Sequence, residues 1–413
     1  TTGARNTVVG AAAGVTMSTA ESVTAVGYGA LNANTGSGNT GIGEYALQAN
    51  SSGASNTSLG YRSLYSNTTA SQNTAVGYQS AYSNTTGTAN TAAGYQSLYT
   101  NSTGNNNAAF GQHALRFNTV GNNNTALGLQ ALYSNTTGSY NTGVGLSPLV
   151  ANTTGSYNTA VGQDALGSNT TASSNTAVGY QAAYSNATGT NITAIGRGAL
   201  YNNTADNNTA IGKLAGYSNT TGTANVFIGS ESAASGYAAG YSNTTGSSNT
   251  AIGSNALGSN TTASQNTAVG YQAAYFNTTG QGITAIGSQV LYNNTTGVSN
   301  VGVGGTWSGN VNGALINNTT GNYNTAMGVG ALQANTTTQG SSAVGYQALY
   351  SNTASYNTGM GYQALYSNTS GTKGAAFGVQ ALYSNTTGSY NVAVGQESLF
   401  SNTTADYNTA VGY

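Results

Sequence analysis

A phrase of 17 residues recurs along the whole chain, and it constrains the fold more than any other feature of the sequence. One copy begins at Asn73 and reads Asn-Thr-Ala-Val-Gly-Tyr-Gln-Ser-Ala-Tyr-Ser-Asn-Thr-Thr-Gly-Thr-Ala. The glycine after the apolar residue, Gly77 in this copy, is one of 24 such marker glycines, and most successive marker glycines are 17 residues apart. Such a period predicts a solenoid, in which each repeat is one structural unit that stacks on its neighbours.

The departures from this period are confined to two places in the repeat. Two steps are seven residues longer, through insertions at 230–236 and 305–311 that directly follow a marker glycine. Three steps are one residue shorter, and each loses its residue between the loop asparagine and the next copy of the phrase. Length changes collect in turns. We therefore expect the insertions to project from a turn and to leave the coils above and below in register.

The segments of fixed length have the alternation of strands. Asn-Thr-Ala-Val-Gly and Ala-Leu-Tyr-Ser-Asn each alternate apolar with small polar residues, a period of two. Helices are disfavoured, because glycine costs about 1 kcal/mol relative to alanine inside a helix. The sequence predicts an all-β parallel β-solenoid, or β-roll, of about 24 coils stacked ~4.8 Å apart. Residues 1–413 are expected to form a single repeat domain, a fragment of a longer fibre, with the side chains at Val76 and Leu98 and their equivalents inside.

Two positions of the repeat hold asparagine with great regularity. The first position of the first strand is Asn in 19 of 24 repeats, and a loop Asn occurs in 22 coils, from Asn34 to Asn402. Stacked amide side chains can hydrogen-bond one another along an axis, as in cross-β assemblies. The pattern predicts such ladders. The alternative is that these residues merely suit turns, because asparagine tolerates the left-handed backbone region.

Both faces of the first strand lack charge. Val76 lies on one face and Ala75 on the other, because successive side chains of a strand point to opposite sides. A two-sided coil has only one interior, so the second face needs a partner. We expect homo-oligomers in which a second chain buries Ala75, Ala126 and Ala177.

Composition argues against several function classes. Charged residues make up 3% of the chain, the formal net charge is −1 and there is no cysteine. We therefore expect no nucleic-acid partner, no membrane span in this segment and no disulfide. The single histidine, His113, cannot form a metal site alone. Serines lack a base that could activate them, so neither catalysis nor a cofactor is expected.

The phrase Asn-Thr-Ala-Val-Gly, as at Asn73 or Asn408, resembles the Ser-Val-Ala-Ile-Gly phrase of the head repeats of trimeric, YadA-like autotransporter adhesins. Similar repeats occur in phage tail-fibre proteins. The resemblance covers nearly every repeat, although the repeat of that family is typically shorter and the extra residues here fall in the Asn-Thr-Thr-Gly turn. It implies left-handed β-rolls in a homotrimer. It also implies an adhesive fibre on a cell or virion surface, without catalysis.

Two sets of residues are candidates for contacts. Aromatic residues after the inward leucine should face outward, where they could bind sugars or a neighbouring fibre, or simply stack on one another. The aromatic candidates are Tyr65, Tyr82, Tyr99, Tyr133, Tyr184, Tyr201, Tyr275 and Tyr292, with Trp307 in the second insertion. Asn-x-Thr triplets form the second set and are formal glycosylation acceptors expected on an exposed turn, although they arise easily in such a composition. These acceptors are Asn67, Asn84, Asn135, Asn152, Asn219, Asn277, Asn385 and Asn402.

The favoured interpretation is a structural, adhesive extracellular fibre that contacts a carbohydrate or a cell-surface receptor. Two alternatives remain: a glycosylated, self-assembling extracellular filament, and a solenoid that binds carbohydrate or ice. Regular threonine columns such as Thr85 and Thr86 could order water, but an ice binder needs a long flat plane, which the variable turn at 118–120 interrupts.

Overall fold

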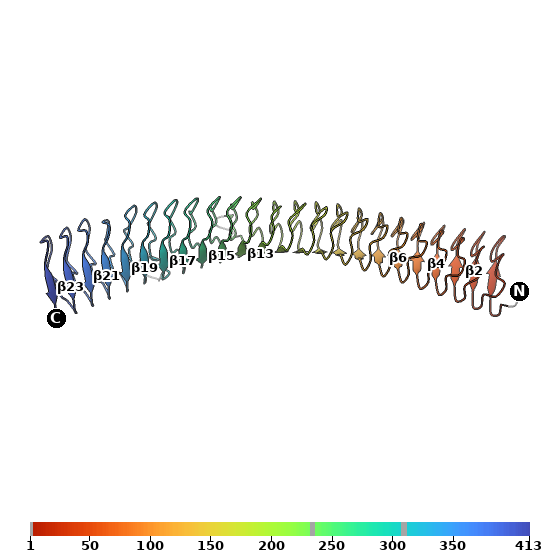
Figure 1. The fold of residues 1–413 in the computed structure, drawn as a ribbon, viewed down its shortest axis with the longest axis horizontal. Coiled ribbons are helices and arrows are strands. Elements are labelled where there is room, and N and C mark those ends of the chain that lie inside the picture. The colour runs from red at the N-terminus through yellow and green to blue at the C-terminus, as the bar shows by residue number, and fades with distance from the viewer. Residues whose placement is uncertain (1–2, 232–235, 307–311) are drawn as a thin grey trace. The chain divides into compact units, whose positions relative to one another are not determined.

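The computed structural model describes residues 3–231, 236–306 and 312–413, and every regular element among them is a β-strand. The chain divides into two compact units, Thr1–Gly198 and Ala199–Tyr413. Within each unit the backbone winds through successive coils, and each coil contributes one strand to a parallel sheet (Figure 1). The prediction of an all-β parallel solenoid with a 17-residue repeat is confirmed.

The strands are short, three residues each. The first unit contains β1 (Thr7–Val9), β2 (Thr24–Val26), β3 (Thr40–Ile42), β4 (Thr57–Leu59), β5 (Thr74–Val76), β6 (Thr91–Ala93), β7 (Ala108–Phe110), β8 (Thr125–Leu127), β9 (Thr142–Val144), β10 (Thr159–Val161), β11 (Thr176–Val178) and β12 (Thr193–Ile195). The second contains β13 (Thr209–Ile211), β14 (Val226–Ile228), β15 (Thr250–Ile252), β16 (Thr267–Val269), β17 (Thr284–Ile286), β18 (Val301–Val303), β19 (Thr325–Met327), β20 (Ser342–Val344), β21 (Thr358–Met360), β22 (Ala375–Phe377), β23 (Val392–Val394) and β24 (Thr409–Val411).

Consecutive strands within each unit pair in parallel, position on position. In the first unit Thr159 of β10 faces Thr176 of β11, and the next two pairs follow without a shift. In the second unit β14 pairs with β15 and β18 with β19, although seven extra residues separate the strands of each pair. The prediction that the insertions leave the register intact is therefore confirmed. Residues 232–235 and 307–311, including Trp307, lie outside the described residues.

The prediction of a second strand is wrong. The segment after each marker glycine forms two consecutive turns, closed by hydrogen bonds from the backbone N–H of Ser80 to the carbonyl of Gly77 and from that of Asn84 to Ala81. Gln79 and Ala81 have φ values of 51° and 47°. Gln79 is the third residue of the first turn, where a type II turn requires a positive φ. Ala81 is the first residue of the second turn, and its positive φ, like that of Gln79, is incompatible with a strand.

These turns still hydrogen-bond along the axis, as strands do. The backbone N–H of Ala81 donates to the carbonyl of Ser97 in the next coil at 2.9 Å, and that of Gln79 donates to Tyr61 in the preceding coil at 2.9 Å. The turn backbone is thus satisfied by its neighbours above and below, as buried backbone groups must be. This is why a coil with only three strand residues can stack regularly.

The marker glycine permits both the turn and the close stacking. Gly77 has a φ of 130°, a region that side-chain-bearing residues rarely adopt. A Cβ on Gly77 would also lie only 2.6 Å from the carbonyl oxygen of Gly94 in the next coil. The column of glycines therefore sets both the bend and the spacing.

The interior contains the alanine of the strand and the leucine of the turn. Leu98 and its equivalents are fully buried, as predicted, except Leu399 in the last complete coil, which is partly exposed. Val76, however, points outward with 38% of its surface exposed, while Ala75 is fully buried. The placement of Val76 inside was wrong. The space opposite the leucine is narrow: a Cβ on Gly41, the inward residue of β3, would lie 3.0 Å from Cγ of Leu31. Only a small residue fits there.

Two ladders of asparagine complete the core, and both were predicted. In the loop column the side-chain amide of Asn101 donates to the side-chain oxygen of Asn84 at 2.7 Å, and Asn118 donates to Asn101 at 2.8 Å. In the strand column the backbone N–H of Asn90 donates to the side-chain oxygen of Asn73 at 2.9 Å. These side chains are buried, and their hydrogen bonds offset the cost of removing amides from water.

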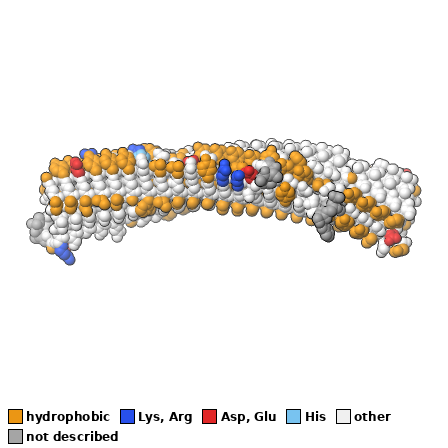
Figure 2. Space-filling model, turned by 180° about the vertical axis from the view of Figure 1, so that it is seen from behind, with side chains coloured by type: hydrophobic (Ala, Val, Ile, Leu, Met, Phe, Trp, Pro, Cys, Tyr) orange, Lys and Arg blue, Asp and Glu red, His pale blue; other side chains and the backbone are white. Residues whose placement is uncertain are grey.

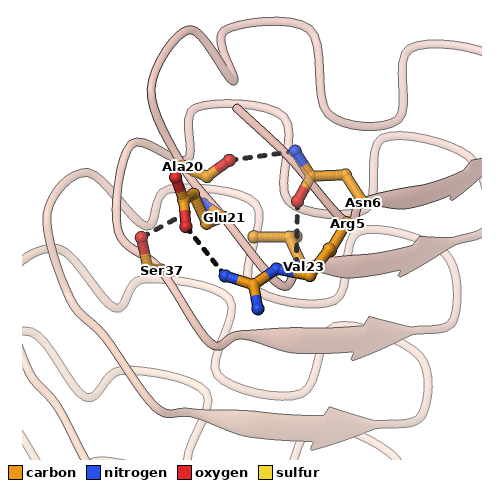
Figure 3. A network of polar contacts seen from close by, with 6 residues as sticks. All are labelled: Arg5, Asn6, Ala20, Glu21, Val23 and Ser37. Carbon is orange, nitrogen blue, oxygen red and sulfur yellow. Dashed lines mark hydrogen bonds and ion pairs between the residues drawn. The ribbon is translucent and has the colours of Figure 1, made fainter. Parts of the chain in front are cut away.

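The ladder continues where asparagine is replaced. Val23 occupies a strand-column position, and its backbone N–H still donates to the side-chain oxygen of Asn6 in the preceding coil, at 3.0 Å (Figure 3). The side-chain amide of Asn6 donates in turn to the carbonyl of Ala20 at 2.9 Å. An exposed ion pair between Arg5 and Glu21 lies beside this network. Where another residue replaces asparagine, the column therefore loses one side-chain amide but keeps the backbone hydrogen bond.

Candidate binding surfaces

An apolar column runs along each unit on the outer side of its sheet. It consists of the residue before each marker glycine, which we call the apolar strand face. In the first unit these residues are Val9, Val26, Ile42, Leu59, Val76, Ala93, Phe110, Leu127, Val144, Val161, Val178 and Ile195, and in the second Ile211, Ile228, Ile252, Val269, Ile286, Val303, Met327, Val344, Met360, Phe377, Val394 and Val411. Each is at least partly exposed. Figure 2 shows hydrophobic side chains gathered in long rows with few charged groups beside them.

This arrangement corrects the expected interface. Ala75, Ala126 and Ala177 were expected to need a second chain, but each is fully buried within its own chain. The uncovered surface is the opposite side of the strand, which is the apolar strand face. Exposed apolar patches larger than a few hundred Å² on a soluble protein mark interaction sites.

A column of threonines accompanies the apolar strand face. Thr159 of β10 and Thr176 of β11 lie directly opposite each other, two positions before Val161 and Val178. Because alternate residues of a strand share a face, each such strand presents one hydroxyl and one apolar side chain outward. The alternation is kept wherever the strand begins with threonine.

The tyrosines after the inward leucine stack on one another. The rings of Tyr65 and Tyr82 have centroids 5.0 Å apart and planes at 2°, and Tyr82 and Tyr99 are 5.2 Å apart at 13°. In the second unit Tyr275 and Tyr292 are 5.5 Å apart at 13°. The ring faces within a stack therefore cover each other, and the outward parts are edges and hydroxyl groups. Mutual stacking was the alternative to sugar binding for these residues, and this geometry favours it.

The remaining aromatic candidates have varied surroundings. Tyr201 stacks on Tyr217 at 5.1 Å, and Tyr133 meets the edge of Phe117 at 85°. Tyr184 is half-buried and lies over Gly167, where a Cβ would approach the ring to 2.9 Å. No single row therefore unites all eight tyrosines.

Burial changes the acidity of some stacked phenols. Burial, followed by the influence of Tyr237 and Tyr292, raises the pKa of Tyr275 above the usual phenol value. Burial, followed by the influence of Tyr350 and Tyr383, likewise raises the pKa of Tyr366. The stacks therefore favour the neutral form.

The expectation that the Asn-x-Thr asparagines lie on an exposed turn is wrong for seven of the eight. Asn67, Asn84, Asn135, Asn152, Asn219, Asn277 and Asn385 have at most 1% of their surface exposed. Their amide nitrogens donate to the ladder and to the carbonyl three residues ahead, as Asn84 does to Gly87 at 2.9 Å. Only Asn402, in the last loop, is partly exposed. A glycan on any of the seven would disrupt the core, because the modified nitrogen is the one that forms these bonds.

His113 lies among aromatic rings. It meets Tyr95 at 5.4 Å and Tyr133 at 6.1 Å between ring centroids. Burial, followed by the positive charge of Arg116, lowers the pKa of His113. Within the part of the chain that the structure describes, no three His, Cys, Asp or Glu side chains come together as metal ligands would. The surroundings of His113 are those of an aromatic contact.

Neither a protein-family model nor a curated protein sequence matches the chain. Over residues 3–231, 236–306 and 312–413, no helix has the length and apolar character that crossing a membrane requires.

Proposed function

We propose that the protein is a structural and adhesive fibre that works on the surface of a cell or virion rather than as an enzyme. The observation that supports this most is the axial bonding: backbone hydrogen bonds and two asparagine ladders link most coils of each unit to their neighbours. Each coil hydrogen-bonds to its neighbours and packs its leucine, alanine and tyrosine side chains on theirs. Such a protein can vary in the number of coils without changing its cross-section, as a shaft requires.

We propose further that copies of the chain associate, as a homotrimer, through the apolar strand face. Val144, Val161 and Val178 are stacked outward on consecutive coils. The surface around them carries almost no charge, because only 3% of the residues are charged. Burying apolar surface of this kind between chains stabilises their association by about 25 cal/mol for each Å² removed from water. A second and third copy offer the same surface in matching register.

Replacing Val144, Val161 and Val178 by threonine tests this association. Threonine has the shape of valine and suits strands, so circular dichroism should be unchanged. Light scattering should give a multiple of the 41.0 kDa chain mass for the wild type and a smaller mass for the variant. A matched control replaces the exposed threonines Thr137, Thr154 and Thr171 by serine and should keep the wild-type mass. A wild-type mass of one chain would contradict the association.

Ice binding is a second candidate, and the paired threonine and valine columns favour it. Thr159 and Thr176 repeat the same outward position on a regular sheet, as a surface that orders water would require. By contrast, the Thr85 hydroxyl donates to the carbonyl of Ser102 at 2.9 Å, so that column is engaged within the chain. Thermal hysteresis of the wild-type protein, lost in a Thr159→Val and Thr176→Val variant, would support this function. Its absence would leave the fibre as the better account.

A further inference from the structure

A groove in the second unit differs from the rest of the surface. It has a volume of about 580 Å³ and runs across several coils beside the loop asparagine column. Phe276, Asn293 and Asn317 line it on the side before the loop asparagine, and Thr278, Thr295 and Thr319 line it on the side after. The two preceding coils have serine at the position of Phe276, Ser242 and Ser259, and the two following coils have asparagine, Asn293 and Asn317. The phenylalanine is therefore a local addition to a regular pattern.

The ring of Phe276 is turned relative to the tyrosine stack. Its plane makes angles of 70° with Tyr275 and 78° with Tyr292, whereas those two tyrosines are nearly parallel to each other. The phenylalanine ring thus lies along the stack, across the tyrosine edges, and 41% of the residue is exposed. Unlike the stacked tyrosines, it can offer a ring face to a ligand.

The polar groups of the groove are neutral. The side-chain amide of Asn317 donates to the carbonyl of Gln333 at 3.0 Å, and that of Asn293 makes only a long contact of 3.5 Å to Asn317. The hydroxyl of Thr295 donates to the carbonyl of Thr319 at 3.1 Å, so its oxygen remains able to accept. Among the residues that the structure describes, none of those lining the groove is charged. A charged ligand would find no counter-charge here.

We propose that this groove binds a neutral glycan. A pyranose ring has an apolar C–H face that packs on an exposed aromatic ring, and a rim of hydroxyl groups that amides can pair with. Phe276 would take the C–H face, and Asn293 and Asn317 would bond the hydroxyls. The rise of one coil, ~4.8 Å, is close to the length of one sugar in an extended chain. This inference rests on the adhesive role proposed above and assigns its ligand class.

The first unit supplies a matched control. Phe117 occupies the same position of its coil and also meets a tyrosine edge-on, Tyr133 at 85°. However, the guanidinium of Arg116 lies over the Phe117 ring, 5.2 Å from its centroid. A covered ring face cannot accept a sugar. Phe117 should therefore play no part in binding.

The test compares Phe276→Ser with Phe117→Ser in the full chain, each giving the residue of one adjacent coil, Ser259 and Ser134 respectively. Cellohexaose, chitohexaose and maltohexaose serve as probes, with saturation-transfer NMR and calorimetry as readouts. We expect at least one probe to bind the wild type, a loss of affinity of at least tenfold in Phe276→Ser, and none in Phe117→Ser. No binding of any probe, or equal binding by Phe276→Ser and the wild type, would overturn the inference. Light scattering on the same samples reports association separately, so failure of the groove and failure of the fibre can be told apart.

Discussion

Phe227 occupies the space that Gly240 leaves empty in the core of the second unit. Phe227 is the inward residue of β14, where most strands have alanine, and it is fully buried. Gly240 and Gly216 stand at the turn position that is leucine in coils such as that of Leu257. A Cβ on Gly216 would lie 2.6 Å from the phenylalanine ring, and one on Gly240 would overlap it. One large side chain on the strand thus replaces two on the turn.

Gly240→Leu should destabilise the protein, and Phe227→Ala should restore it. The leucine alone overpacks the core, at a cost of about 1–3 kcal/mol or more. Phe227→Ala alone leaves a cavity that costs about 3–5 kcal/mol. The double variant recreates the usual pair of a strand alanine and a turn leucine, and it should recover most of the lost stability. Thermal unfolding measures this; a double variant less stable than both single variants would contradict the exchange.

Asn152→Ala should destabilise the coils around it. The Asn152 amide donates to Asn135 at 2.8 Å and to the carbonyl of Gly155 at 3.0 Å, and its oxygen accepts from Asn169 at 2.7 Å. A buried polar group left without a partner costs about 1–3 kcal/mol. Hydrogen exchange should accelerate between β9 and β11. Thr154→Ala, an exposed change in the same loop, should leave exchange unaltered.

Glycosylation of the folded chain should be limited to Asn402 among the eight predicted acceptors. The other seven are buried in the ladder, where no transferase can reach the amide nitrogen. Treating folded protein with an oligosaccharyltransferase and a glycan donor, followed by peptide mass spectrometry, checks this. Unfolded protein is the control and should accept glycans at several sites. Modification of Asn84 or Asn152 in folded protein would show that the ladder opens.

Stability should fall in alkali. The pKa of Tyr366 is raised in the folded state, so the folded chain holds its phenol proton more tightly than the unfolded chain. Such a group contributes stability that is complete below the unfolded value, about 10, and is lost as pH rises through the folded value. Unfolding followed from pH 8 to 11.5 should show this decline. Tyr366→Phe should decline less steeply, because Phe400 already stacks in that column without a hydroxyl.

The period, the strand and the asparagine ladders could be predicted because stacking places every residue on its own equivalent. The second strand could not. Alternation in Ala-Leu-Tyr-Ser-Asn matches a strand, but Leu98 has a φ of 50°. Leucine carries no sequence signal for that conformation, which costs about 1–2 kcal/mol and is held here by packing and axial hydrogen bonds.

Which face of the strand points inward could have been predicted from residue size, although not from hydrophobicity. The position of Ala75 is Ala, Gly or Ser in nearly every repeat, whereas that of Val76 accepts Val, Ile, Leu, Met and Phe. A closely packed interior fixes volume, while an open surface tolerates any size. Uniform size therefore marked the core better than apolar character did. The groove at Phe276 depends on ring orientation, which no repeat pattern contains.

Axial hydrogen bonding has a mechanical consequence. Tension applied along the axis loads the bonds between coils end to end, so the outermost coil should detach before the next is strained. Each detachment would release 17 residues, about 55 Å of extended chain. A single-molecule pulling experiment would then record a long series of small, nearly equal extensions, and the chain would yield gradually where a globular domain would break at once.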